Sequence, residues 1–260
     1  GLKGVAREAQ VPALFEAYDI PCVFSDPLTL ALALDKAMAK RVVASQGVPT
    51  ADFAVIEQER DLAGLSLDYP LFAKPVAEGS GKGVDARSLV RNKGELADTV
   101  RDLFRRFQQP VLVETYLSGR EFTVGITGTG ASAEVLGVTE IRPLANYVGH
   151  GYGLANKETG WEDKVEIVLA DPANAAAAGK VALAAWRALR CRDGGRVDIR
   201  CDDAGRHHFI EVNPLAGIRP HHSDLCLMAE RLGISYRELI GRIMASFERR
   251  QPQLKRRAAA

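Results

Sequence analysis

Residues 196–213, RVDIRCDDAGRHHFIEVN, hold the pattern from which the rest of the chain is interpreted. Apolar and polar residues alternate on both sides of DDAG, which predicts two β-strands joined by a turn. With the turn centred on Ala204 and Gly205, Asp198 and Glu211 become cross-strand partners on one face of a hairpin. Phe209 is expected on that same face.

The two facing acids require an explanation, because directly opposed like charges destabilise a hairpin. A cation bound between them would remove the repulsion. Asn213 lies two residues beyond Glu211 on the same face and adds an amide oxygen. Two carboxylates and an amide form a hard oxygen site that suits Mg²⁺ held together with substrate phosphates. The alternative is a solvated hairpin face with a chance pairing, and Phe209 on that face argues against it.

Composition narrows the class of protein. A chain of 260 residues can bury a core as one large domain or as two lobes. The formal net charge of +1 gives the protein no strong positive field that would attract nucleic acid. No run of apolar residues is long enough to span a membrane. There is no signal peptide, and the start at Gly1 rather than Met indicates a processed or truncated N-terminus. The four cysteines lack CxxC spacing, so free thiols in a reducing cytoplasm are expected.

Periodicity and turn residues predict alternating helices and strands. A long polar and glycine-rich loop is expected over 143–163, and no core-forming pattern is found over 251–260. Helices are predicted over 7–18, 27–47, 93–107, 172–189, 224–232 and 235–249, and strands over 21–24, 51–57, 71–74, 111–114, 121–127 and 132–142.

Three segments in the first hundred residues contain lysines or a glycine-rich loop. Lys36 and Lys40 share one helix face at i, i+4, and a solvated face is the default interpretation. Lys74 lies among apolar residues, where burial is costly unless a negative partner is present. The loop 76–84, VAEGSGKGV, could bring backbone N–H groups to phosphate oxygens, although an ordinary hairpin loop is more common for such a segment.

Taken in order, these segments resemble the ATP-grasp superfamily, and within it the D-alanine–D-alanine ligase family. The resemblance runs from about Arg7 to about Ile243 and rests on strings such as PLFAKPVAEGSGKGV, VLVETYLSGREFTV, RVDIR and FIEVN. It implies an α+β fold with two lobes, each built on an antiparallel sheet with helices, and ATP in the cleft between them. It also implies a remnant of an N-terminal domain over 1–34, a small lobe with a glycine-rich lid over 35–118, a large lobe with the metal site over 119–250, and a tail over 251–260.

The resemblance implies the nucleotide-binding residues one by one. Lysines and the glycine-rich lid would hold the phosphates, an acidic residue and the segment after it would hold adenine, and a second glutamate would hold the ribose. In this chain these are Lys36, Lys74, Ser80 and Gly81 for the phosphates, Glu114, Tyr116 and Leu117 for adenine, and Glu121 for the ribose.

The same resemblance implies the residues of the reaction. Mg²⁺, or Mn²⁺ in its place, would be held by the residues already derived from the hairpin. An arginine would stabilise the acyl-phosphate step, a glycine N–H would bind the tetrahedral intermediate, and a lysine of the 143–163 loop would contact phosphate. These are Asp198, Glu211 and Asn213 for the metal, and Arg196, Gly217 and Lys157 for the chemistry.

The expected function is an ATP-dependent ligase that joins the carboxylate of an amino acid or similar acid to an amino acid amine. His222 stands near the family serine that holds the second substrate, which puts D-alanine as acceptor in question. A ligase of specialised metabolism with other substrates is one alternative, and an ATP-binding module without ligase activity is another. Small molecules are the expected partners, with no nucleic acid and no membrane, in a cytoplasmic protein that could form a homodimer.

Overall fold

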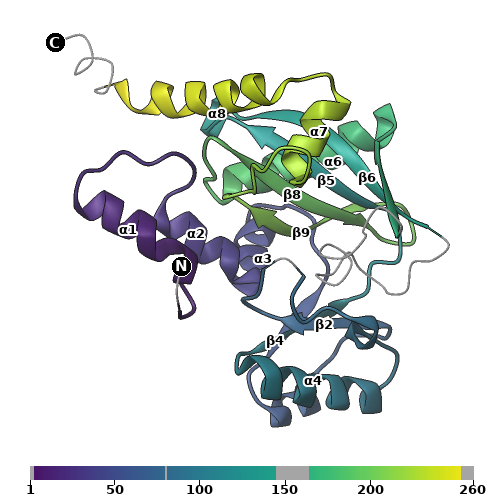
Figure 1. Cartoon of the computed structure of the whole chain (residues 1–260). Coiled ribbons are helices and arrows are strands. Elements are labelled where there is room, and N and C mark those ends of the chain that lie inside the picture. The colour runs from purple at the N-terminus through teal and green to yellow at the C-terminus, as the bar shows by residue number, and fades with distance from the viewer. Residues whose placement is uncertain (1–2, 80, 145–163, 253–260) are drawn as a thin grey trace.

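A computed structural model describes residues 3–79, 81–144 and 164–252 and contains two antiparallel sheets with helices packed on them (Figure 1). The larger sheet and its helices form an upper lobe in this view, and the smaller sheet with α4 forms a lower one. The predicted α+β architecture with two antiparallel sheets is therefore confirmed. Ser80, Lys157, most of the predicted 143–163 loop and tail residues 253–260 lie outside the described residues.

The small lobe is a four-stranded sheet in the order β1-β4-β2-β3. Helix α4 packs its apolar side chains, among them Leu96 and Val100, against this sheet. The Asn92 side chain begins the helix by accepting a hydrogen bond from the backbone of Glu95 at 3.0 Å. The predicted helix and three predicted strands are confirmed, and the short β3 was not predicted. The bounds are Phe53–Ile56 for β1, Leu71–Pro75 for β2, Leu89–Val90 for β3, Lys93–Phe107 for α4 and Val111–Thr115 for β4.

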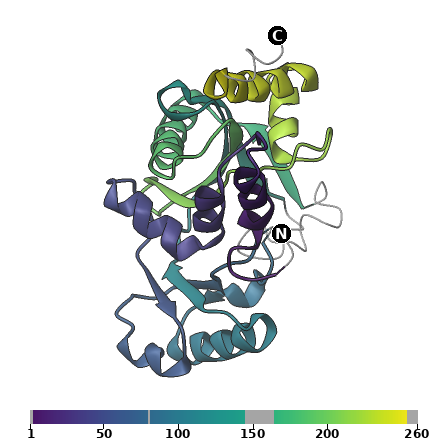
Figure 2. The same ribbon diagram turned by 90° about the vertical axis from the view of Figure 1, so that its left-hand side faces the viewer.

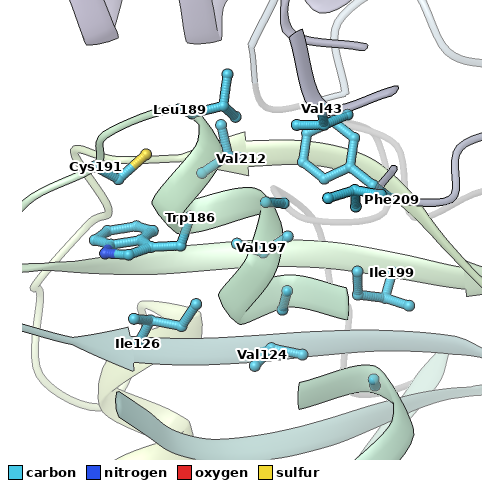
Figure 3. Close-up of a cluster of buried hydrophobic side chains, with 14 of the residues drawn as sticks. Val43, Val124, Ile126, Trp186, Leu189, Cys191, Val197, Ile199, Phe209 and Val212 are labelled. Atoms are coloured by element: carbon cyan, nitrogen blue, oxygen red, sulfur yellow. The ribbon is translucent and has the colours of Figure 1, made fainter. Parts of the chain in front are cut away.

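The large lobe is a five-stranded sheet in the order β7-β6-β5-β8-β9, with β7 not predicted. Helix α6 packs on one face, where the fully buried Trp186 lies among Ile126, Val197 and Val212 (Figure 3). Helices α7 and α8 pack with a second apolar cluster that includes Leu136. The bounds are Glu121–Thr127 for β5, Glu134–Pro143 for β6, Val165–Leu169 for β7, Pro172–Ala188 for α6, Gly194–Cys201 for β8, His207–Asn213 for β9, Asp224–Arg231 for α7 and Tyr236–Arg250 for α8.

Two glycines let α7 approach the large sheet. Gly125 and Gly137 are paired in the β5–β6 register. A Cβ at Gly125 would lie 2.7 Å from the sulfur of Met228, and a Cβ at Gly137 would lie 2.5 Å from Leu232 Cδ1. A larger residue at either position would push α7 away from the sheet.

The N-terminal helices lie beside the large lobe and face the viewer in Figure 2. The predicted first helix is confirmed as η1 (Arg7–Ala9) followed by α1 (Gln10–Ala17). The predicted strand over 21–24 is wrong. Phe24 has a left-handed φ of 74°, and its N–H donates to Asp193 at 2.8 Å. Arg250 donates to the carbonyls of Cys22 and Phe24. Side chains of the large lobe thus satisfy backbone groups that a strand would pair with a neighbour.

The single helix predicted over 27–47 is two helices, α2 (Pro27–Leu34) and α3 (Lys36–Ser45). Asp35 separates them with an extended ψ of 98°, and its side chain accepts a hydrogen bond from the backbone of Met38 at 2.9 Å. An aspartate can cap a helix inside a helical sequence pattern. The break lets α3 start between the two lobes.

The hairpin around which the sequence was interpreted is present as β8 and β9. Asp198 pairs with Glu211, as predicted. The pairing then shifts, so that Ile199 faces Phe209 and Ile210 is an extra residue, a β-bulge. The expectation that Phe209 shares the carboxylate face is therefore wrong, because the bulge turns it into the core, where it is fully buried.

Candidate active site

A cleft between the two lobes contains most of the predicted site residues. Its empty space, with the open mouth included, is about 920 Å³, which is within the range of sites for small ligands. The predicted residues that line it are Lys36, Lys74, Gly81, Glu114, Tyr116, Leu117, Glu121, Asp198 and Glu211. Sequence reasoning did not select Phe72, Lys82, Thr123, Arg200 and Ile210, which line it as well.

Glu114 is buried in the wall of the cleft and binds two lysines. Lys74 Nζ lies 2.5 Å from Glu114 Oε1, and Lys40 Nζ lies 2.8 Å from Glu114 Oε2. Burial alone would raise the pKa of Glu114, but the two ammonium groups lower it from 4.5 to about 2. The negative partner that Lys74 was expected to require is therefore Glu114.

Lys36 joins the glycine-rich loop to the carboxylate face. Its Nζ donates a hydrogen bond to the carbonyl oxygen of Glu78 and lies 3.3 Å from Glu211 Oε2. Lys36 is 8% exposed and Lys40 is 0% exposed, so the default interpretation of a solvated lysine face is wrong. Both lysines belong to α3, which packs against both lobes, so this face has little access to bulk water.

The carboxylates of Asp198 and Glu211 face the cleft from neighbouring strands. Thr123 Oγ1 donates to Asp198 Oδ1 at 3.0 Å, and Arg196 Nε lies 3.4 Å from the same oxygen. Asn213 pairs with Arg196 in the register, and its amide nitrogen is buried with no hydrogen-bond partner among the described residues. The amide is therefore not fixed by a protein contact at that atom.

The carboxylates of Asp198 and Glu211 and the amide of Asn213 are hard oxygen donors of the kind that Mg²⁺ prefers. In the described part of the chain, no three acidic, histidine or cysteine side chains form a group that could hold a metal ion. Two carboxylates and an amide oxygen leave an octahedral shell incomplete. That is the usual arrangement for Mg²⁺ held by one or two carboxylates together with substrate phosphates and water. The carboxylates of Asp198 and Glu211, which line the cleft, fit a magnesium ion that arrives with a nucleotide, whereas Asn213 is not among the residues that line it.

Arg196 is held in place by two acids. Its NH1 lies 2.5 Å from Asp224 Oδ2, in addition to the contact with Asp198. Burial would lower the pKa of Arg196, but these carboxylates raise it, so the guanidinium stays charged. Gly217 and His222 lie in the loop between β9 and α7 and do not line the cleft as the structure describes it. His222 is exposed.

Aromatic and charged groups are stacked in the wall of the cleft beside Lys74, whose Nζ lies 5.8 Å from the centre of the Phe72 ring. The rings of Phe72 and Tyr116 stack with centroids 6.3 Å apart, and the Arg200 guanidinium lies 5.3 Å from the Tyr116 centroid. Arg200 NH1 is 3.4 Å from Glu121 Oε2. Arg200 shares the alternating face of Asp198, and that signal in the sequence could have identified it.

All four cysteines are free thiols, as predicted. Among the described residues, none of the helices combines the length and apolar character required to cross a bilayer.

Two antiparallel sheets that enclose a cleft lined by lysines and carboxylates are the arrangement of an ATP-grasp protein, and the family match agrees with it. The family described as D-ala D-ala ligase C-terminus matches residues 42–245. The chain belongs to this family of ATP-grasp ligases, and the resemblance noted from its sequence is confirmed.

Individual relatives agree with this assignment. The D-alanine–D-alanine ligase of Bordetella pertussis is 35% identical over 242 residues, which are 92% of this chain and 74% of the relative. An uncharacterized protein of Sinorhizobium fredii is 30% identical over 256 residues, 96% of this chain and 73% of the relative. The crystal structure of the VanG D-Ala:D-Ser ligase from Enterococcus faecalis matches with a TM-score of 0.77 at 26% identity, over 92% of this chain and 68% of that one. A D-alanine–D-alanine ligase from Bacillus anthracis, complexed with ATP, shares the fold with a TM-score of 0.74 at 24% identity, over 94% of this chain and 76% of that one.

Proposed function

We propose that this protein is an ADP-forming ligase that joins the carboxylate of an amino acid or similar acid to the amine of an amino acid. The observation that carries the proposal is the convergence of two basic residues, Lys36 and Lys74, with two acidic ones, Asp198 and Glu211, on one cleft between the lobes. Making an amide from a carboxylate requires an activated acyl group, and ATP supplies one as an acyl phosphate.

The nucleotide would lie along the cleft. The stacked rings of Phe72 and Tyr116 offer an apolar platform for adenine. Arg200 holds Glu121 where a ribose hydroxyl could bind. Lys74 lies beside this platform, with its Nζ 5.8 Å from the centre of the Phe72 ring, and Lys36 and Gly81 also line the cleft. The proposed nucleotide-binding residues are Lys36, Lys74, Ser80, Gly81, Glu114, Tyr116, Leu117 and Glu121.

The chemistry would depend mainly on neutralising phosphate charge and on positioning. Lys36 and Lys74 contribute point charges, and Arg196 contributes a cation that two carboxylates keep in one orientation. Magnesium, held by Asp198, Glu211 and Asn213, would add positive charge at the transferred phosphoryl group. The backbone N–H of Gly217 and the side chain of Lys157 are the further groups proposed for the reaction.

The acceptor is proposed to differ from D-alanine. His222 stands where the family pattern has a serine, and an imidazole is larger than a hydroxyl and carries positive charge only when protonated. A ligase with other amino acid substrates is therefore the form of the proposal that this loop favours. The VanG relative is a D-Ala:D-Ser ligase, so a change of acceptor occurs among proteins of this fold.

The test combines ATP with a panel of acids and amines and measures phosphate release. The acid is labelled with ¹⁸O in its carboxylate, and the phosphate is analysed by mass spectrometry. An acyl-phosphate route moves one labelled oxygen from the acid to the phosphate for each amide formed. ATP binding without phosphate release for any pair would instead support a nucleotide-binding module, and amide formation with unlabelled phosphate would exclude the acyl phosphate.

A further inference from the structure

Lys40 is a buried cation that does not line the cleft. Besides its ion pair with Glu114, its Nζ donates to Thr50 Oγ1 at 2.6 Å and lies 5.7 Å from the centre of the Phe53 ring. Thr50 in turn donates to the carbonyl oxygen of Phe209 at 2.9 Å. Burial of a charge is costly, and a Lys74–Glu114 pair would already be neutral without it. The presence of a second buried lysine, Lys40, beside Glu114 therefore requires an explanation.

The charges of this cluster do not cancel. Each oxygen of Glu114 binds one lysine, so Lys40, Lys74 and Glu114 together carry a charge of one positive unit. Of the two lysines, Lys74 lines the cleft and Lys40 does not. The excess positive charge is thus presented to the cleft at Lys74. Without Lys40, the cluster would be neutral, and the field of Glu114 would oppose that of Lys74.

We infer that Lys40 is a positioning residue for nucleotide binding: by neutralising one oxygen of Glu114, it leaves the charge of Lys74 available to the nucleotide phosphates. The inference rests on the proposed function, because it concerns the same ATP site. It predicts that Lys40 increases the affinity for ligands with phosphate groups and does not change the affinity for the nucleoside alone.

The experiment measures the dissociation constants of ADP and of adenosine by competition with a fluorescent nucleotide. The ratio of the adenosine constant to the ADP constant isolates the contribution of the phosphates. In Lys40→Met this ratio should fall about tenfold, the effect of one unit charge roughly 10 Å away at an effective dielectric constant of about 20. Adenosine affinity should change less than about twofold, and Lys74→Met gives the reference for loss of the phosphate-facing charge itself.

Two further variants separate charge from packing. Thr50→Val removes a hydrogen bond of Lys40 but no charge, so it should lower stability and leave the ratio unchanged. The double variant Lys40→Met/Glu114→Gln restores one positive unit, and its ratio should return to the wild-type value. If Lys40→Met does not fold, the charge of Lys40 is tested in the Glu114→Gln background, where removing it should lower the ratio about tenfold.

The outcomes separate the two ideas. A ratio that stays at the wild-type value in Lys40→Met, or equal losses of ADP and adenosine affinity, would overturn the role of Lys40 and leave the ATP site intact. Wild-type protein that binds no ADP would overturn the proposed function and this inference with it. A ratio that falls in Lys40→Met and recovers in the double variant supports the role.

Discussion

Replacing Glu114 by glutamine removes the carboxylate shared by Lys40 and Lys74. The fold lowers the pKa of Glu114 from 4.5 to about 2, and this difference corresponds to about 3 kcal/mol at 1.36 kcal/mol per unit. Because the folded-state pKa is depressed, this stability is present above pH 4.5 and is lost as the pH falls toward 2. At pH 7 the variant should lose about 3 to 5 kcal/mol, since two buried ammonium groups also lose their partner.

Urea unfolding of the wild type and Glu114→Gln at pH 6 and pH 3 measures this difference. Other carboxylates titrate in both proteins, so subtracting one free energy of unfolding from the other isolates Glu114. The linkage relation predicts that the difference shrinks by about 2 kcal/mol between pH 6 and pH 3. A difference that is the same at both pH values, or a variant as stable as the wild type at pH 7, would refute the reasoning.

Three more predictions concern the reaction. Asp198→Asn and Glu211→Gln should each abolish Mg²⁺-dependent turnover with little change in melting temperature, and normal turnover at ordinary Mg²⁺ would rule out the metal assignment. His222→Ser should shift acceptor preference toward small amino acids in a panel run at two pH values, whereas an unchanged ranking together with efficient use of D-alanine by the wild type would contradict the proposed acceptor. Asp224→Asn removes the partner 2.5 Å from Arg196, so kcat should fall about tenfold with ADP affinity unchanged; equal loss in both would mean that Asp224 only supports the fold.

The carboxylate face of the site could be predicted from the strict alternation of apolar and polar residues in two strands. Period-2 patterning put Asp198 and Glu211 on one face of a hairpin, because each strand has only two faces, and they are paired in the structure. The assumed turn centre was wrong, because next to the turn Ile199 pairs with Phe209 and not with Ile210. Ile210 is an extra residue that restores the pairing of Asp198 with Glu211, and no glycine or other local signal indicates this bulge in the sequence. Phe209 was consequently assigned to the carboxylate face when it belongs to the core.

Contacts between residues far apart in the sequence determine the burial of Lys40 and the conformation of residues 21–24. Nothing local to Lys40 distinguishes it from a solvated lysine, because Glu114 lies 74 residues away in the chain and Thr50 lies on another segment. The residues 21–24 have strand-forming side chains, yet Arg250 and Asp193 from the far end of the sequence hold their backbone in another conformation. Such contacts have no signature in a single sequence.

The bulge at Ile210 reduces the spacing between the side chains that one strand presents to the cleft. On a regular strand, neighbours on one face are two residues apart, about 6.6 Å along the chain. Here Ile210 and Glu211 are consecutive and both line the cleft, so an apolar group and a carboxylate are presented from Cα atoms only about 3.8 Å apart. In the proposed nucleotide site, one extra residue would thus let a single strand contact two chemically different parts of one ligand, a flat apolar group and a metal-bound anion, without a second element being brought to the site.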